Sequence, residues 1–352
     1  MPISRRRLYV NGLSSIIGNS TAENALINWA ANKNIDTLMY YGIRGYLGAS
    51  PATNFAVSNT AADNIGKFLQ NARLSNIPNH VAVMGGSKEY ITPASAENEL
   101  NISPFGNKII NNYHAAPSIS YNQTKSFFDN SAGRSGLNLE LEYWWDHTLG
   151  GASPVYPNGV TDAGYQTWLA TGDLNKERLK NFSVWAGIIK SYNRWKEWMK
   201  NQNRFVSNEA YIGFLNPPGY EMYECGEIVK NLQTINIHAY RAPNNVNDSI
   251  TTYASNIWNY VRTRVDWVGR AQAVYLPFTK MKISLIYSFE QDSSGNPIFS
   301  SPWFQANPGV TLDQLHNAVE AQFNASSFPG KNYVEIVGWT IFPYTKEKIY
   351  LP

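Results

Sequence analysis

The sequence predicts one α/β domain over residues 1–352, folded as a (β/α)8 TIM barrel with insertions in its βα loops. Apolar segments typical of strands alternate with helical patterns along the whole chain, and eight strand segments can be counted. A barrel of this type has about 250 residues, and the surplus falls in residues 87–122 and 146–172. An open doubly wound sheet is the alternative, but no GxGxxG or phosphate-binding loop follows the first strand.

The expected strands are short runs rich in β-branched, aromatic or leucine residues. In chain order they are residues 8–10, 35–41, 80–84, 135–145, 210–215, 234–240, 282–289 and 334–341. The expected helices place apolar residues on one face, and they are residues 20–31, 61–72, 122–130, 175–202, 223–231, 249–268 and 311–323. Capping side chains are expected at Ser20, which forms a capping box with Glu23, and at Asp248 and Thr311.

The composition argues against a nucleic acid or an anionic membrane surface as partner. Lys and Arg total 29 and Asp and Glu total 26, so the formal charge is only +3. The basic run of residues 5–7 is short, and we expect it to be a solvated flank at the N-terminus. Aromatic residues make up 14% of the chain and charged residues 16%, a balance common in proteins that contact sugars.

No cofactor, metal site or membrane span is expected. Cys225 is the only cysteine, so an intrachain disulfide cannot form, and the five histidines show no ligand spacing. No apolar run reaches the roughly 18 residues that a membrane span needs. The charged residues at the N-terminus are not followed by an apolar segment, so no signal peptide is expected. The compartment stays open, and contact with secreted or cell-surface glycans fits the composition.

The fourth expected strand carries an acidic face. Side chains alternate between the two faces of a strand, so Asn138, Glu140 and Glu142 lie on one face and three leucines on the other. Carboxylates on an inward face are costly to desolvate unless they form pairs or take part in chemistry. We therefore interpret this segment as the catalytic strand of the barrel.

The active site of a barrel is built at the C-terminal ends of its strands. The residues expected there are Tyr41, Gly85, Gly86, Glu142, Tyr143, Asn216, Tyr240, Arg241, Glu290 and Trp339, with Trp144 and Trp145 placed to line a subsite. This set combines carboxylates with aromatic rings and contains no phosphate cradle or nucleophilic elbow. It favours glycoside hydrolysis, in which a carboxylic acid protonates the leaving oxygen and aromatic rings hold the sugar.

Four motifs resemble those of glycoside hydrolase family 18, the chitinases and endo-β-N-acetylglucosaminidases. Residues 136–143 match in spacing the DGxDxDxE motif of the family's fourth strand, and residues 83–86 resemble the end of its SxGG motif. Residues 235–241 resemble its MxYD motif, and residues 336–339 fit the strand that places a tryptophan under the sugar. The four motifs occur in the family's order over nearly the whole chain.

The resemblance implies a role for each residue. Glu142 would be the general acid, and the substrate's own 2-acetamido group would be the nucleophile, as in the substrate-assisted glycosidases. Glu140 would orient and stabilise that acetamido group, Tyr240 would donate a hydrogen bond to its oxygen, and Trp339 would form the apolar floor. Asn138 stands where the family has an aspartate that can take up a proton.

Other interpretations stay open. A glycan-binding or structural barrel that does not hydrolyse its ligand also fits the sequence. The reason is that Asn138, Glu140 and Arg241 stand at positions where the family has aspartates. Glu140 could be a structural acid paired with Arg241 or another cation of the barrel. A third interpretation is an unrelated barrel hydrolase that uses Glu142 and Glu290 as its two carboxylates.

Overall fold

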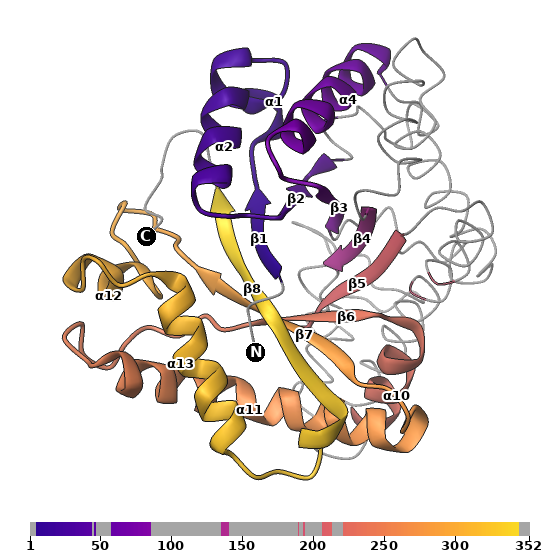
Figure 1. Ribbon diagram of the computed structural model, residues 1–352, viewed down its shortest axis with the longest axis vertical. Helices are drawn as coiled ribbons and strands as arrows, with labels where there is room; N and C mark the ends of the chain where they lie inside the picture. The colour runs from indigo at the N-terminus through magenta and orange to yellow at the C-terminus, as the bar shows by residue number, and fades with distance from the viewer. Residues whose placement is uncertain are drawn as a thin grey trace, which may run out of the picture.

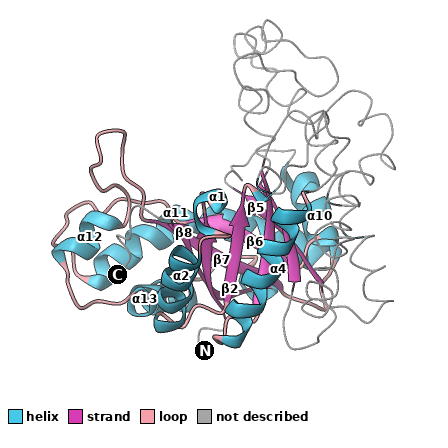
Figure 2. Ribbon diagram, turned by 90° about the horizontal axis from the view of Figure 1, so that it is seen from above, coloured by secondary structure: helices cyan, strands magenta, loops and turns pink. Residues whose placement is uncertain are grey.

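The chain forms a closed eight-stranded barrel, which confirms the predicted fold class. The computed structural model describes residues 5–43, 46, 58–85, 135–140, 189, 193, 206–212 and 221–344. All neighbouring strands pair in parallel and follow the order of the sequence, with β8 pairing with β1 to close the ring. In Figures 1 and 2 the described helices lie around the outside of this ring of strands.

Each predicted strand overlaps an observed one. The strands are β1 (Arg5–Val10), β2 (Thr37–Tyr41), β3 (Asn79–Gly85), β4 (Ser135–Glu140), β5 (Val206–Ile212), β6 (Thr234–His238), β7 (Met281–Ser288) and β8 (Val334–Tyr344). The bounds of β1 correct one expectation, because the strand begins at Arg5 and contains the basic run. Arg7 is only 1% exposed and pairs in register with Thr37 and Thr340, so it is no part of a solvated flank.

Five of the described helices overlap predicted ones, and three short helices, at residues 13–16, 301–306 and 331–333, were not predicted. The described helices are α1 (Leu13–Ile16), α2 (Ser20–Asn32), α4 (Asn59–Leu74), α10 (Glu221–Asn231), α11 (Ile250–Tyr275), α12 (Ser301–Ala306), α13 (Leu312–Ala325) and the 3-10 helix η4 (Lys331–Tyr333). The predicted helix 122–130 lies outside the described residues, and of 175–202 only Ile189 and Asn193 are described, both helical. None of the helices in the described part of the chain has the length and apolar character needed to cross a membrane.

The caps of three helices test the local sequence signals. Thr311 caps α13 and forms a capping box with Gln314, which confirms that prediction. The other two predicted caps are wrong by one residue: Asn19 caps α2 by accepting from the backbone of Ala22, and Ser249 caps α11. Asp248 instead accepts a hydrogen bond from the backbone N–H of Asn245, so it stabilises the turn before the helix.

Two apolar clusters follow from the alternation of side chains along the strands. The larger one lies between the strands and the helices and includes Leu139 of β4. The smaller one consists of Tyr9, Met39, Val81, Val83, Tyr211 and Ile286, and Tyr240 and Phe342 pack against it. These residues alternate along their strands with members of the larger cluster, so the smaller cluster fills the barrel interior. Asn138 therefore points inward and Leu139 outward, as the acidic strand predicts.

An extra residue in β8 reverses the facing of its second half. Ile283 of β7 pairs with Ile336, but Ser284 pairs with Gly338, so one residue of β8 is skipped. Ile336 belongs to the outer cluster, and strict alternation would point Trp339 into the barrel. Because the bulge shifts the alternation by one residue, Trp339 points outward. Gly338 permits this path, since its φ is +153° and a Cβ would lie 2.0 Å from the carbonyl oxygen of Arg5.

We expect Gly338→Ala to destabilise the barrel strongly, because the added methyl group collides with the backbone of β1. Gly309→Ala is the matched control, since its φ is +99° but no atom lies within 4 Å of the added Cβ. Urea unfolding should show a loss of about 1 kcal/mol for the control and at least about 2 kcal/mol more for Gly338→Ala. Equal losses in the two variants would contradict the close contact between β8 and β1.

Candidate active site

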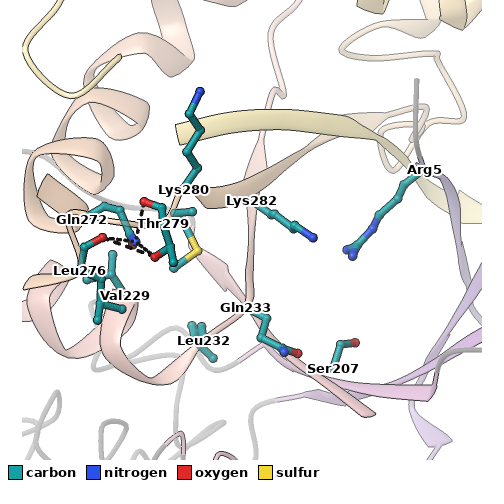
Figure 3. Close-up of a pocket in the computed structure, with 11 residues that line it drawn as sticks. Arg5, Ser207, Val229, Leu232, Gln233, Gln272, Leu276, Thr279, Lys280 and Lys282 are labelled. Atoms are coloured by element: carbon teal, nitrogen blue, oxygen red, sulfur yellow. Dashed lines mark hydrogen bonds between the residues drawn. The ribbon is translucent and has the colours of Figure 1, made fainter. Parts of the chain in front are cut away.

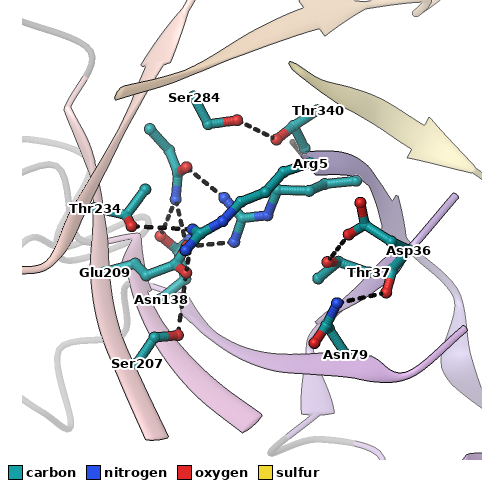
Figure 4. Close-up of polar contacts among 12 residues, drawn as sticks. Arg5, Asp36, Thr37, Asn79, Asn138, Ser207, Glu209, Thr234, Ser284 and Thr340 are labelled. Atoms are coloured by element: carbon teal, nitrogen blue, oxygen red, sulfur yellow. Dashed lines mark hydrogen bonds and ion pairs between the residues drawn. The ribbon is translucent and has the colours of Figure 1, made fainter. Parts of the chain in front are cut away.

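A buried ion pair lies at mid-height in the barrel. Arg7 of β1 pairs with Glu209 of β5, and both side chains are at most 2% exposed. Arg7 also donates to Asn236 Oδ1 at 2.7 Å, and the Nη1 of Arg5 lies 3.8 Å from the second carboxylate oxygen of Glu209. Ser207 donates to that same oxygen at 3.1 Å. Figure 4 shows Arg5 and Ser207 around the Glu209 carboxylate.

The surroundings of Glu209 keep it ionised. Burial alone raises the pKa of this carboxyl, but the charges of Arg7 and Arg5 and the hydrogen bonds from Arg7 and Asn236 lower it by more. The net effect is a pKa below its ordinary value. A fully buried carboxylate is tolerated here because its charge is compensated and both oxygens accept hydrogen bonds.

A directed chain of hydrogen bonds leads from this ion pair toward the carboxyl end of the barrel. Arginine can only donate, so Asn236 turns its carbonyl oxygen to Arg7 and its Nδ2 to Asn138 Oδ1, at 2.8 Å. The Nδ2 of Asn138 then donates to the hydroxyl oxygen of Tyr9 at 3.0 Å. Because the Tyr9 oxygen accepts this bond, its own hydrogen points away from Asn138.

Phenols and carboxylates converge at the carboxyl ends of the strands. Burial raises the pKa of Tyr240 well above its ordinary value, and the neighbouring Tyr211, Glu140, Tyr9 and Glu290 raise it further. The charges of two carboxylates, one from β4 and one from the segment after β7, therefore raise the pKa of the same phenol. Tyr240 stays protonated across the physiological range, so it can donate a hydrogen bond.

Tyr9 belongs to the same group. Burial raises the pKa of Tyr9 well above its ordinary value, and the charges of Glu140 and Glu209 add to this effect, which outweighs the opposing charge of Arg7. Glu140, the last residue of β4, is partly exposed. The group of Tyr9, Glu140, Tyr211, Tyr240 and Glu290 is called the mouth cluster below.

Aromatic rings flank the mouth cluster. The ring of Tyr240 lies 6.1 Å from that of Phe342, with only 25° between their planes, and 5.3 Å from that of Phe299. Phe342 also meets Tyr9 edge to face at 5.3 Å, and His238 meets Tyr240 in the same way at 5.3 Å. Phe342 is partly exposed near the end of β8. Its ring therefore lies between those of Tyr9 and Tyr240 at the carboxyl end of the barrel.

Trp339 does not face the barrel interior, which corrects the expectation that it forms the floor under a sugar. Its side chain is 3% exposed and packs in the outer apolar cluster. Its Nε1 donates to Asp313 Oδ1 of α13 at 2.8 Å, so the indole joins the barrel to a helix. The bulge beside Gly338 explains the difference.

The other expected site residues fall into two groups. Tyr41 is 39% exposed at the end of β2, Gly85 pairs in register with Glu140, and Arg241 is exposed just after β6. No ion pair of Arg241 is found within the described residues, so a pairing with Glu140 has no support there. The expected residues outside the described part of the chain are Gly86, Glu142, Tyr143, Trp144, Trp145 and Asn216.

Several residues of this region were not found from the sequence, namely Tyr9, Glu209, Tyr211, Asn236, Phe299 and Phe342. A signal existed for some of them. Glu209 and Asn236 are polar residues on inward positions of β5 and β6, as Asn138 and Glu140 are on β4. Among the described residues, no group of three or more His, Cys, Asp and Glu side chains is arranged to hold a metal ion.

Comparisons with known proteins support the fold. No protein-family model and no curated protein sequence matches the chain. A glycoside hydrolase family 18 chitinase from Pseudoalteromonas aurantia is similar in structure, with a TM-score of 0.50 and 11% identity over 97% of this chain and 94% of the chitinase. A β-glucosidase from Exiguobacterium marinum matches with a TM-score of 0.47 and 9% identity over 91% of this chain and 77% of the β-glucosidase. A xylanase and α-amylase inhibitor protein from Scadoxus multiflorus matches with a TM-score of 0.45 and 10% identity over 96% of this chain and 92% of the inhibitor. The likeness to the chitinase supports a glycosidase-like barrel fold.

We expect Glu209→Gln to destabilise the fold by about 3–5 kcal/mol at pH 7, because it leaves the buried charge of Arg7 uncompensated. The folded pKa of Glu209 lies below its ordinary value of 4.5. The stabilisation is therefore complete above pH 4.5 and is lost as the pH falls through the folded pKa. Urea unfolding from pH 7 to pH 3 should show the gap between wild type and variant closing at the acid end.

Glu335→Gln is the control for this experiment, since Glu335 is a half-buried carboxyl of β8 with no ion pair among the described residues. Its effect should stay within about 0.5 kcal/mol at every pH. A Glu209→Gln variant as stable as this control would show that the ion pair does not stabilise the barrel.

Proposed function

We propose that the protein is a glycoside hydrolase that acts on N-acetylglucosamine-containing glycans, of the chitin, N-glycan core or peptidoglycan type. The observation that carries this proposal is the mouth cluster, where Glu140 and Glu290 raise the pKa of the same partly buried phenol, Tyr240, at the carboxyl end of a closed barrel. Active sites of such barrels are built at this end. Carboxylates beside protonated phenols and aromatic rings suit acid-assisted cleavage of a sugar.

Glu142 is the proposed general acid. It lies outside the described residues, so its role rests on the sequence, in which it follows Glu140 by two positions in the predicted strand 135–145. In the proposed step the glycosidic oxygen takes the proton of Glu142 as the bond to the anomeric carbon breaks. The oxygen of the substrate's 2-acetamido group bonds to that carbon and closes a five-membered ring. A water molecule later attacks the same carbon, which opens this five-membered ring, and the water gives a proton back to Glu142.

Glu140 and Tyr240 are proposed to act on the acetamido group. As its oxygen attacks, positive charge develops on its nitrogen, and a preorganised carboxylate at Glu140 stabilises that charge. Tyr240 stays protonated because burial and the nearby carboxylates raise its pKa, so its hydroxyl can hold the acetamido oxygen. The ring of Phe342, rather than that of Trp339, provides the apolar contact beside Tyr240.

Asn138 has a positioning role in this proposal. It is fully buried, donates to Tyr9 and accepts from Asn236, so it holds the Tyr9 hydroxyl in one orientation. An amide cannot take up a proton as a carboxylate can. This observation also favours a second candidate function, a barrel that binds the glycan without cleaving it.

We expect Glu142→Gln to lower kcat on chito-oligosaccharides by about 100- to 10,000-fold, because the amide of glutamine has no acidic proton to transfer. Calorimetry should show that the variant still binds the oligosaccharide. Glu335→Gln, which changes a carboxyl on the first half of β8, is the control and should turn over like the wild type. Equal turnover by Glu142→Gln and wild type would contradict the catalytic role. Binding by the wild type without cleavage over days would favour the second candidate.

We expect Tyr240→Phe to lower kcat by about 100-fold with little change in KM, because the hydrogen bond to the acetamido oxygen strengthens in the transition state. Tyr287→Phe is the matched control, since the Tyr287 hydroxyl contacts His316 of α13 on the outer side of the barrel. Steady-state kinetics of both variants on a chromogenic chitobioside test this role. A kcat loss of the same size in the two variants would show that the Tyr240 hydroxyl has no specific effect.

A further inference from the structure

A cavity lies at the opposite end of the barrel from the mouth cluster. It has a volume of about 540 Å³ and is bounded by the amino-terminal parts of several strands, including Arg5 of β1, Ser207 of β5 and Lys282 of β7. The end of α10 and the turn after α11 complete its wall. Pockets of this size commonly hold small molecules.

The described lining of this cavity is cationic. Arg5, Lys280 and Lys282 contribute positive charge, and no carboxylate lines the cavity among the described residues. In Figure 3 the side chains of Lys282 and Arg5 point toward each other across the cavity, with Gln233 and Ser207 nearby. Lys282 has no ion pair within the described part of the chain, even though Glu335 is its register partner on β8. Glu209 lies 3.8 Å from Arg5 but also pairs with Arg7, so a single carboxylate faces both arginines and the positive charge of Lys282 adds to theirs.

The other side of the cavity is apolar. Val229, Leu232, Leu276 and Met281 line it, and Figure 3 places the labelled Val229, Leu232 and Leu276 away from Arg5. This cavity therefore has one charged and one apolar half. A ligand that fills it has to match both halves.

The wall of the apolar half is held in place by a buried amide. Gln272 of α11 is 1% exposed, and its Nε2 donates to the carbonyl oxygens of Leu276 and Thr279, at 3.0 and 3.1 Å, and to Thr279 Oγ1 at 2.8 Å. These bonds fix the turn that leads from α11 into β7 and carries Lys280. Because the wall is preformed, a ligand can bind without the cost of ordering it.

We propose that this cavity binds a small oxyanion that carries an apolar chain, such as a phosphate monoester or a carboxylate. The oxyanion lies between Lys282 and Arg5, where the amide of Gln233 can donate a further hydrogen bond. The apolar chain of the ligand lies against the apolar half of the cavity. This site is separate from the proposed glycan site, because it lies at the amino ends of the strands.

Hexyl phosphate tests the proposal by calorimetry at low ionic strength. It should bind at one site per chain, at least about 10-fold more tightly than inorganic phosphate or hexan-1-ol, each of which matches only one half of the cavity. Lys282→Gln should weaken this binding by about 10-fold or more, and added sodium chloride should weaken it in the wild type. Lys67→Gln, which removes an exposed lysine of α4, is the matched control and should bind like the wild type.

Thermal unfolding without ligand shows whether Lys282→Gln is folded, and hexyl phosphate should raise the Tm of the wild type but not that of the variant. Unchanged binding by Lys282→Gln would overturn the site. If inorganic phosphate binds as tightly as hexyl phosphate, the apolar half of the cavity does not contribute to binding. If hexyl phosphate does not bind at millimolar concentration, the proposed site is wrong. None of these results depends on glycan turnover, so failure here is distinct from failure of the proposed function.

Discussion

The ion pair of Arg7 and Glu209 is the constraint on which the interior of the barrel depends. Two opposite charges from strands on different sides of the ring meet where water is excluded, and neither is tolerated there without the other. Arginine has only donors, so this pair also sets the orientation of the Asn236 amide and, through it, of Asn138 and Tyr9. A structural charge pair thereby determines which way a hydroxyl at the mouth points.

The polar groups of the interior form three levels along the barrel axis. Cationic side chains line the amino-end cavity, the buried ion pair occupies the middle, and carboxylates with phenols form the mouth cluster. Each level suits a different kind of contact. The cationic amino end suits an anion, the middle holds the buried ion pair, and the mouth suits a neutral, hydroxyl-rich ligand that can meet acids and donors.

The sequence predicts features that depend on local periodicity and misses those that depend on distant partners. All eight strands follow from short apolar runs, and the facing of Asn138 and Leu139 follows from alternation. The burial of Arg7 depends on an acid 202 positions away, so a run of three arginines could not be distinguished from a solvated flank. The facing of Trp339 depends on how β8 pairs with β7 and β1, and a bulge at that contact leaves no local signal except Gly338.

The position of a bound sugar tests the central claim most directly. A crystal structure of the wild-type chain with a thio-linked chito-oligosaccharide, which resists hydrolysis, should show an N-acetylglucosamine ring at the carboxyl end of the barrel. Its acetamido oxygen should lie within about 3.2 Å of the Tyr240 hydroxyl, with the ring against Phe342. A sugar bound elsewhere on the molecule, or a mouth cluster covered by other side chains with no room for a sugar ring, would contradict the account.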